Sequence, residues 1–240
     1  MSYQLLNVGA NAKTVKGDRK GFLTGILYLA PAQEAGVKDS KGKIITLCPY
    51  SSKGCRKACL YDSGRSVVFP KIKEARIRKT RELFYKTDEF MKKLYQDILI
   101  LEAQAKGKDL KPAVRLNGTS DLDWREFTHE GKTLFEIFSH IQFYDYTKRL
   151  DLFTGTPKNL HLTFSLSGTN HIQAKKISKD KNINLAIVVS NELKKEFLKD
   201  SKTFIDGDVD DLRFLDPTNK IVLLKAKGKA RKDNTGFLVG

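Results

Sequence analysis

The sequence predicts an α/β protein whose mostly parallel strands form a partial or complete α/β barrel. Short apolar segments rich in β-branched and aromatic residues recur along the chain, and segments with helical periodicity separate several of them. Polar side chains follow directly after many of these apolar segments, which is typical of parallel strands that end at a functional site. We find no internal repeat and no low-complexity linker, so residues 1–240 are expected to form one α/β domain.

The expected strands are short, and several are almost continuously apolar, as strands are when both faces of a sheet are covered. In chain order they are residues 22–29, 44–47, 113–116, 141–144, 160–166, 185–189, 203–205 and 221–224. Helices are expected at residues 71–86, 88–106, 134–139 and 191–199. The clearest helix has Phe90, Leu94 and Ile98 on one stripe, with Thr87 as its N-cap. Alternating strands and helices indicate parallel βαβ units.

The composition is that of a folded protein that remains outside membranes. The hydrophobic fraction is 40%, with 14 Phe and 8 Tyr, which is enough apolar surface to build a core. No run approaches the roughly 18 apolar residues of a membrane-spanning helix, and the first residues lack the apolar core of a signal peptide. We therefore expect a cytoplasmic protein with no membrane partner.

The charge is strongly positive, with 44 Lys and Arg against 28 Asp and Glu and a net charge of +16. Such a surface attracts polyanions, because each neutralised phosphate releases condensed counterions. A nucleotide or nucleic acid is therefore one expected partner. The other interpretation is that lysine-rich helices simply keep the protein soluble.

Polar residues at the ends of the expected strands are the candidates for binding a small-molecule cofactor or substrate. In barrels and doubly wound sheets, ligands bind beyond the carboxyl ends of the strands. The candidates are Asn117, Thr119, Ser120, Asp121, Lys148, Ser165, Ser167, Asp206 and Asp208. The last two begin an acidic run, DGDVDDLRFLDP, which is compatible with Mg²⁺, with ribose hydroxyls or with an ordinary turn.

All three cysteines of the chain, Cys48, Cys55 and Cys59, lie in one short segment, LCPYSSKGCRKACLYDSGR, with the spacing C-x6-C-x3-C. An odd number of cysteines in a reducing compartment favours metal binding or catalysis over disulfides. The segment follows the expected strand 44–47 and precedes the first long helix. Three thiolates from one loop can bind a four-iron (4Fe-4S) cluster or a zinc ion.

Three interpretations of this segment remain open. An iron–sulfur cluster needs only the three thiolates, with one iron left for another ligand. Structural zinc normally needs a fourth ligand, and the nearby sequence offers no His and no fourth Cys. The fourth ligand would then be Asp62 or a histidine from elsewhere in the chain, namely His129, His140, His161 or His171. Without a metal, the cysteines would be small apolar residues of the interior.

Long strings of the chain resemble a phage protein family labelled gene product 88-like. They are ANAKT, LTGILYLAPA, CPYSSKGCRKACL, RLNGTSDLDW, FYDYTKR, HLTFSLSG, DGDVDDLRFLDP and LKAKGKARKDNTGFLV. The family label carries no activity. The resemblance implies a phage or prophage origin and, for such a protein, the host cytoplasm.

The cysteine loop and the barrel pattern also resemble radical S-adenosylmethionine enzymes, in which three cysteines bind a cluster after the first strand of a partial α/β barrel. Their usual motif is C-x3-C-x2-C, and this chain departs from it. The resemblance implies that the cluster binds S-adenosylmethionine and that its reduction generates an adenosyl radical. The polar strand ends would then line the pocket for the cofactor or the substrate.

The alternative hypothesis is a basic, non-enzymatic phage protein that binds nucleic acid or a host factor, with a structural zinc or a metal-free cysteine loop. A third is a nuclease that binds Mg²⁺ through the carboxylates of residues 206–211. The chain contains no Walker loop, no H-E-x-x-H motif and no G-x-S-x-G nucleophile elbow, so it gives no support to the common kinase and hydrolase classes.

Overall fold

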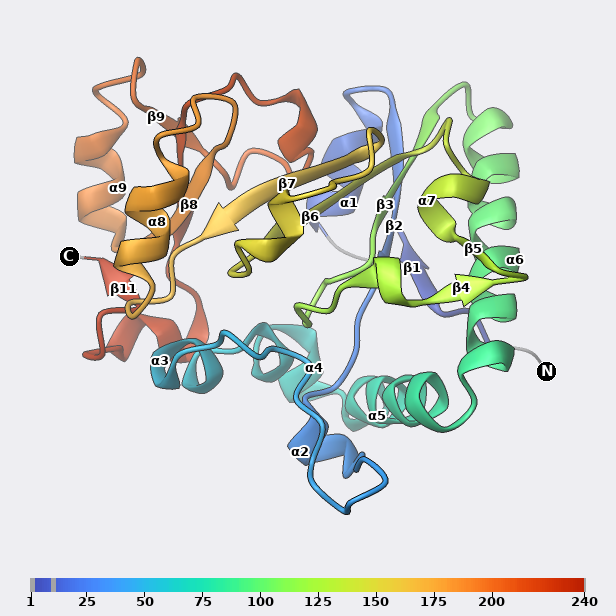
Figure 1. Ribbon diagram of the computed structural model, residues 1–240. Helices are drawn as coiled ribbons and strands as arrows, with labels where there is room; N and C mark the ends of the chain where they lie inside the picture. Colours follow the sequence, from blue (N-terminus) through green and yellow to red (C-terminus); the bar gives the residue numbers. More distant parts are fainter. Residues whose placement is uncertain (1–2, 10–11, 240) are drawn as a thin grey trace.

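The computed structural model describes residues 3–9 and 12–239. Within these residues the protein is a mixed α/β structure built on a mostly parallel sheet of nine strands (Figure 1). The strands are β1 (Leu6–Val8), β2 (Phe22–Leu27), β3 (Lys111–Arg115), β6 (Gln142–Thr147), β7 (Leu160–Ser165), β8 (Leu185–Val189), β9 (Phe204–Asp206), β10 (Ile221–Lys225) and β11 (Leu238–Val239). A separate ribbon pairs β4 (Thr128–His129) with β5 (Lys132–Thr133).

Helices connect most of these strands. The α-helices are α1 (Ala12–Asp18), α2 (Ala32–Ala35), α3 (Lys53–Lys57), α4 (Arg65–Val68), α5 (Pro70–Tyr85), α6 (Thr87–Lys106), α7 (Leu134–Ile137), α8 (His171–Ile177) and α9 (Asn191–Phe197). Short 3-10 helices are η1 (Leu60–Asp62), η2 (Trp124–Glu126), η3 (Asp151–Phe153), η4 (Arg213–Leu215) and η5 (Gly228–Lys232). No helix in the described part of the chain has both the length and the apolar character needed to cross a membrane.

The sheet has the order β1-β2-β3-β6-β7-β8-β10-β9. Every pair along it is parallel except β1 with β2, which is antiparallel. In the described residues the path ends at β1 on one side and β9 on the other, so no closed barrel forms. The expectation of a mostly parallel α/β sheet is confirmed, whereas the complete barrel is not observed.

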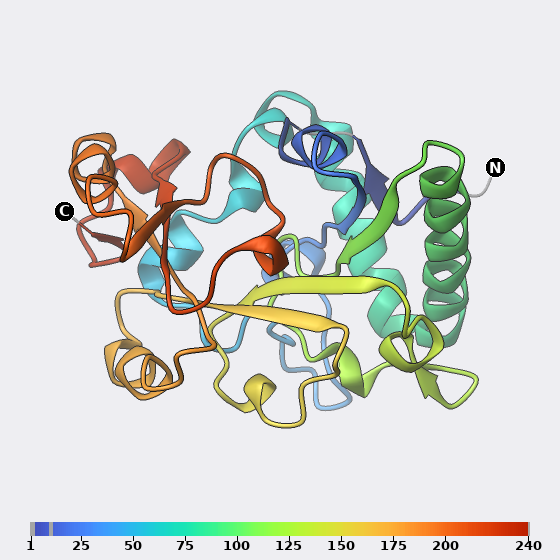
Figure 2. The same cartoon turned by 90° about the horizontal axis from the view of Figure 1, so that it is seen from above.

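The two faces of the sheet are covered differently. On one face, α6 packs Phe90, Leu94 and Ile98 into the main core against strand residues such as Leu23 and Phe143. Each fully buried side chain of this size contributes about 1.5–3 kcal/mol through apolar burial. On the other face lie α1 and the segment around η4, whose Phe214 ring contacts Phe22 and Tyr144 at 4.9 and 5.4 Å between ring centroids (Figure 2).

The prediction of a strand at residues 44–47 is wrong. Within the described residues, this segment makes only an isolated bridge between Lys38 and Ile44, and Ile44 is 43% exposed. Both edges of β2 are already paired, with β1 and β3, so no position beside it is open to another strand. The cysteine segment therefore follows β2 and α2 through an extended connection instead of following a strand directly.

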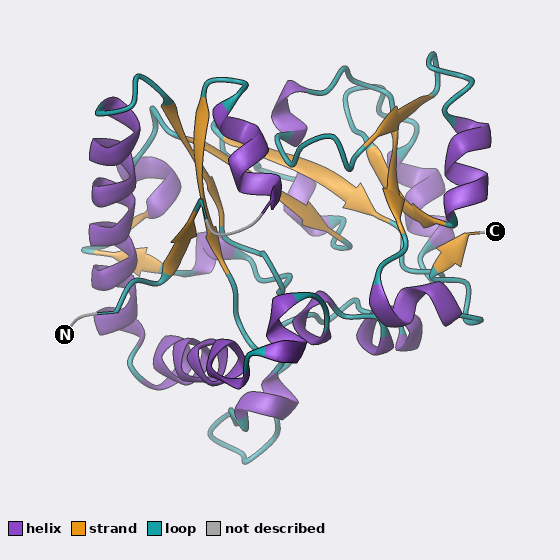
Figure 3. Cartoon of the chain, turned by 180° about the vertical axis from the view of Figure 1, so that it is seen from behind, coloured by secondary structure: helices purple, strands orange, loops and turns teal. Residues whose placement is uncertain are grey.

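A break in the sheet brings the C-terminal segment to the carboxyl ends of the strands. Strand β7 pairs with β8 only at Leu185 and Ala186, while β11 pairs with the same strand at Val188 and Val189. Strand β7 ends at Ser165, beside Ala186, and β11 pairs with the remaining carboxyl-terminal part of β8 (Figures 1 and 3). Residues 233–239 are held beside the cysteine segment as a result.

Candidate functional site

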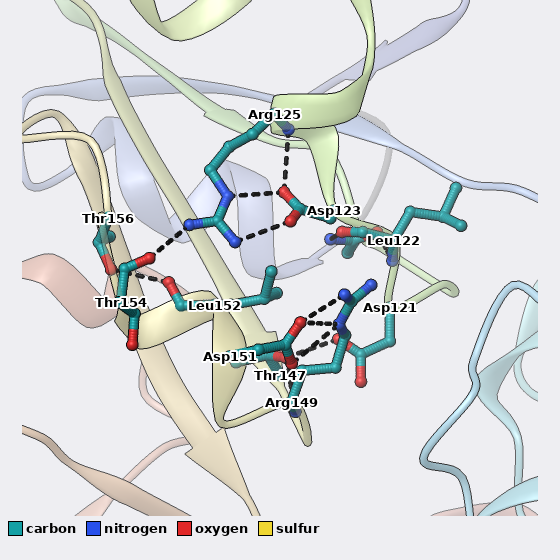
Figure 4. A network of polar contacts seen from close by, with 11 residues as sticks. Asp121, Leu122, Asp123, Arg125, Thr147, Arg149, Asp151, Leu152, Thr154 and Thr156 are labelled. Atoms are coloured by element: carbon teal, nitrogen blue, oxygen red, sulfur yellow. Dashed lines mark hydrogen bonds and ion pairs between the residues drawn. The ribbon is translucent and has the colours of Figure 1, made fainter.

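The cysteine segment lies across the carboxyl ends of β3 and β6. The backbone N–H of Asp121, after β3, donates to the Leu47 carbonyl at 2.7 Å, just before Cys48. Asp121 in turn accepts hydrogen bonds from the Thr147 hydroxyl at 2.7 Å and from the backbone N–H of Lys148 at 3.0 Å, both at the end of β6 (Figure 4). Asp121 therefore joins the cysteine segment to the ends of two neighbouring parallel strands.

Local hydrogen bonds give each cysteine a different backbone setting. Cys48 precedes α3, and its carbonyl accepts from the Ser51 hydroxyl at 2.7 Å. Cys55 lies within α3, where its N–H donates to the Oγ of the N-cap Ser52 at 3.0 Å. Cys59 follows α3, and its Sγ accepts from the N–H of Tyr61 at 3.5 Å. All three thiols are free and partly buried.

Lys148 is the charged group common to the three thiols. Burial by itself lowers the pKa of Lys148, but the nearby Cys55, Asp121, Cys48 and Cys59 raise it, and the net pKa lies above its usual value. Because such effects decay with distance, Lys148 and the three thiols belong to one neighbourhood at the end of β6.

Burial keeps two of the thiols protonated at neutral pH. It raises the pKa of Cys48 to about 12, with Asp121 and the other two thiols adding to the effect and Lys148 opposing it. Burial also raises the pKa of Cys59. A bound metal reverses this preference, because a coordinated thiol is deprotonated outright.

Among the described residues, no group of three or more His, Cys, Asp or Glu side chains is placed to hold a metal ion. Three thiolates are nevertheless the ligands that an iron–sulfur cluster or zinc would need, and the choice between these two stays a prediction.

Most of the candidates after β3 build the loop that carries Asp121. The Asn117 Oδ1 accepts hydrogen bonds from the Ser120 hydroxyl, the Leu122 N–H and the Trp124 indole at 2.8, 3.0 and 3.1 Å. The Thr119 hydroxyl accepts from the N–H of Leu29 and donates to its carbonyl. The structure brings these residues together at the predicted edge, with their side chains engaged in the loop.

The candidates after β7 are also held by a local turn. The N–H of Ser167 donates to Asn170 Oδ1 at 2.8 Å, and the Asn170 amide donates to the Ser165 carbonyl at 3.0 Å. Gly168 follows with a φ of +83°, and a Cβ there would lie 2.5 Å from the Gly236 carbonyl carbon. The turn therefore admits the C-terminal segment only because residue 168 has no side chain.

Asp206 and Asp208 are bound to lysines. Lys194 of α9 contacts them at 2.6 and 2.8 Å, and Lys227 contacts Asp208 at 3.1 Å. Although burial would raise the pKa of Asp208, these lysines and the N–H of Lys225 hold it well below its usual range. The two carboxylates therefore form an ionic anchor between β9, α9 and the segment after β10.

Two features of this site were not predicted from the sequence. One is a bidentate pair in which Arg125 binds Asp123 at 2.7 and 2.8 Å and also donates to the Thr154 carbonyl, which connects the loops after β3 and β6 (Figure 4). The other is the C-terminal segment, whose Asp233 accepts from the backbone N–H of Phe237 at 3.0 Å. The first has a sequence signal, since Arg and Asp two residues apart in a loop can pair. The second has none, because the contacts of this segment with α3 and β8 are distant along the chain.

Comparison with known protein families matches residues 4–239 to the family described as Gene product 88. Neither the curated proteins nor the solved structures give a match. The match covers the cysteine segment, every strand of the sheet and the C-terminal segment beside them. The chain therefore belongs to the Gene product 88 family.

Proposed function

We propose that this protein is an iron–sulfur enzyme whose cluster is bound by Cys48, Cys55 and Cys59 at the carboxyl ends of the parallel strands. The observation that supports the proposal is the placement of the cysteine segment at the carboxyl ends of β3 and β6, where Asp121 donates its N–H to the Leu47 carbonyl beside Cys48 and accepts from the N–H of Lys148. The positive charge of the Lys148 side chain would offset part of the negative charge that three thiolates bring.

The order of the strands supports a likeness to radical S-adenosylmethionine enzymes. Strands β2, β3, β6, β7, β8 and β10 are neighbours in chain order and all parallel, as they are in a barrel that has not closed. The cysteine segment follows the first of them, which is where the resemblance places a cluster. When bound, such a cluster supplies one electron for the cleavage of S-adenosylmethionine.

The residues of the chain have distinct parts in this proposal. Asp121 fixes the backbone of Lys148 and thereby the position of its ammonium, and Thr147 fixes the Asp121 carboxylate. The polar ends of β3, β6 and β7 would surround the space beside the cluster. Ser165 and Ser167 would be the contributions from β7, and Asn117 would act by shaping the loop that carries Asp121.

Anaerobic purification followed by reconstitution with iron and sulfide tests the cluster. We expect about four irons and a matching amount of sulfide per chain, with a brown charge-transfer absorption. Cys48→Ala, Cys55→Ala and Cys59→Ala should each lose most of the iron. Ser63→Ala is the matched control, because it changes the same segment and removes no thiol. A colourless protein, or one with a single zinc ion, would contradict the proposal.

The cofactor is tested on the reconstituted protein. S-adenosylmethionine should change the electron paramagnetic resonance spectrum of the reduced cluster, and dithionite should then yield 5′-deoxyadenosine. If the spectrum of the iron-loaded protein does not change on addition of S-adenosylmethionine, the proposal of this cofactor is wrong. The proposal of the cluster would still stand.

A second candidate function is a non-enzymatic, basic phage protein with a metal-free or zinc-bound cysteine loop. The observation that favours it is the raised pKa of Cys48 and Cys59, since burial keeps both thiols neutral without a metal. Thermal unfolding separates the candidates. If the loop is metal-free, a chelator should leave the melting temperature unchanged and Cys48→Ala should behave as an ordinary substitution in the protein interior.

A further inference from the structure

Two basic segments that are distant in sequence lie side by side in the fold. Helix α3 carries Lys53, Arg56 and Lys57, and η5 with its flanking residues carries a second group of cations. That second group is Lys225, Lys227, Lys229, Arg231 and Lys232. Helix α3 contacts η5, and both lie below the carboxyl ends of the strands (Figure 1).

The C-terminal segment holds these two elements together. A Cβ on Gly54 of α3 would lie 2.8 Å from the Phe237 Cβ and 2.9 Å from Asp233 Oδ1, so the close contact depends on glycine at this position. Lys229 also approaches Asp62, which follows α3, at 3.9 Å. The two basic groups therefore belong to one surface, which we call the α3–η5 surface and define by the eight cations named above.

All eight cations of the α3–η5 surface are exposed, and few acids lie among them. Lys227 is bound by Asp208, and Asp233 uses its carboxylate on the backbone N–H groups of Thr235, Phe237 and Leu238. Positive charge is therefore in excess over the whole surface. The sequence alone could not predict that the cations of α3 and those around η5 form one surface.

We propose that the α3–η5 surface binds the phosphate backbone of a nucleic acid. An interface with an acidic protein would need an apolar centre, yet α3 and η5 expose no large apolar side chain, and Ala230 is buried. The same lack of an apolar face argues against a membrane surface. Interfaces with nucleic acid are instead polar and strongly positive. Tyr50, 53% exposed and just before α3, offers a ring on which a base can stack.

The position of this surface has a consequence for the cysteine site. Cys55 lies in α3 itself, so a bound strand would pass beside the three thiols. This step rests on the proposed function, and under it a nucleic acid is the substrate class of the iron–sulfur site. Binding itself does not depend on a cluster.

Fluorescence anisotropy with labelled single-stranded and duplex DNA of about 20 nucleotides, measured across a series of salt concentrations, tests the proposal. The test variant is Lys53→Gln, Lys57→Gln, Lys229→Gln and Lys232→Gln combined, which leaves the Lys227–Asp208 pair intact. The matched control replaces Lys106, Lys108, Lys111 and Lys181 by Gln. These four lysines are also exposed, but they lie at the amino ends of the parallel strands. Both variants lose the same net charge, and circular dichroism checks that both are folded.

We expect tight binding at low salt, with a steep dependence of the association constant on salt. For a single strand, the test variant should flatten the slope of log K against log salt by about 3, or about 0.7 for each phosphate that is no longer neutralised. The control variant should keep the wild-type slope. Equal weakening in both variants, no binding at low salt, or equally tight binding of polyglutamate would each overturn the proposal. Cys48→Ala separates the two proposals, because it should abolish iron binding and leave DNA binding unchanged.

Discussion

At the scale of single residues, Lys148 is the positive charge that interacts with the thiols of the cysteine segment. Three neutral thiols near a partly buried cation gain little, whereas three thiolates would each be attracted by it. Burial disfavours the positive charge of Lys148, but ionised thiols would stabilise that charge. Under the proposed function, Lys148 would therefore favour the deprotonated thiols.

The first prediction concerns Lys148→Met, which removes the cation and keeps a side chain of similar length. We expect the reconstituted protein to retain iron roughly tenfold more weakly, as changes around a metal site commonly do. Iron content after dilution and gel filtration measures the effect. Lys148→Arg, which keeps the charge, should retain more iron than Lys148→Met. Equal iron retention in wild type and both variants would show that the charge has no part in the site.

The second prediction concerns the ionic anchor formed by Asp208, Lys194 and Lys227. Lys194 and Asp208 have side chains only 9% and 22% exposed, so Asp208→Asn leaves a nearly buried ammonium with less compensation. We expect a loss of about 3 kcal/mol in the free energy of unfolding near neutral pH. Urea denaturation measures it. Asp151→Asn is the matched control, because Asp151 is half exposed and its pair with Arg149 should contribute less than about 1 kcal/mol.

The pH dependence of this difference follows from the lowered pKa of Asp208. A carboxyl group whose pKa is lower in the folded state stabilises the fold above its unfolded pKa, near 3.8. That contribution is lost as the pH falls further toward the folded pKa. The difference between wild type and Asp208→Asn should therefore be constant from about pH 5 to 7 and shrink below about pH 4. A difference that does not change with pH would mean that the substitution acts through packing.

At the scale of elements, the sequence predicted those whose signal is local. The apolar stripe of α6 was expected over residues 88–106 and is observed over Thr87–Lys106, while the strand expected at 185–189 is observed at Leu185–Val189. Segment 44–47 has an equally apolar composition, but no strand edge was open to it. Helix α8 was missed because it buries only Ala174 and Ile177, too few positions for a visible period.

The site was predictable to a similar degree. The cysteines and the polar strand ends could be singled out because both are features of short segments, and their role as a functional site stays a prediction. The contact of α3 with residues 233–237 could not be predicted, because it depends on a glycine at position 54 that looks like a loop residue in the sequence. Pairings between distant segments leave no periodic signal.

The third prediction concerns this contact. Gly54→Ala places a methyl group against Phe237 and Asp233, so the C-terminal segment must move away from α3. We expect a loss of about 1–3 kcal/mol in the free energy of unfolding, as for other overpacked sites. Amide hydrogen exchange should increase in β11 and the preceding segment. Gly107→Ala is the control: its backbone φ is −65° and the nearest atom to a new Cβ is 3.5 Å away, so stability should stay equal or rise by about 0.4–1 kcal/mol. Unchanged exchange in β11 after Gly54→Ala would disprove this account of the contact.

At the scale of the whole molecule, the cysteine segment and the α3–η5 surface lie at the same edge of the sheet. The parallel strands create this edge, because their carboxyl ends all point to it. Because β7 ends beside the start of β8, the rest of β8 is open to β11, and the C-terminal segment brings the second basic group beside the first. The topology of one sheet thus places the basic group of η5 beside α3, which already carries both Cys55 and the first basic group.

The last prediction follows from this shared edge. If a nucleic acid binds across α3, it should shield Cys55, which lies in that helix, from small thiol reagents. Alkylation of the metal-free protein by iodoacetamide, followed by mass spectrometry, should slow several-fold at Cys55 when DNA is added at low salt. High salt should remove the protection, because it releases the DNA. The Lys53, Lys57, Lys229 and Lys232 variant should show no protection under any condition, whereas the variant with the four lysines at the amino ends replaced should be protected like wild type. Protection that survives in the first variant would place the bound strand on a different surface of the protein.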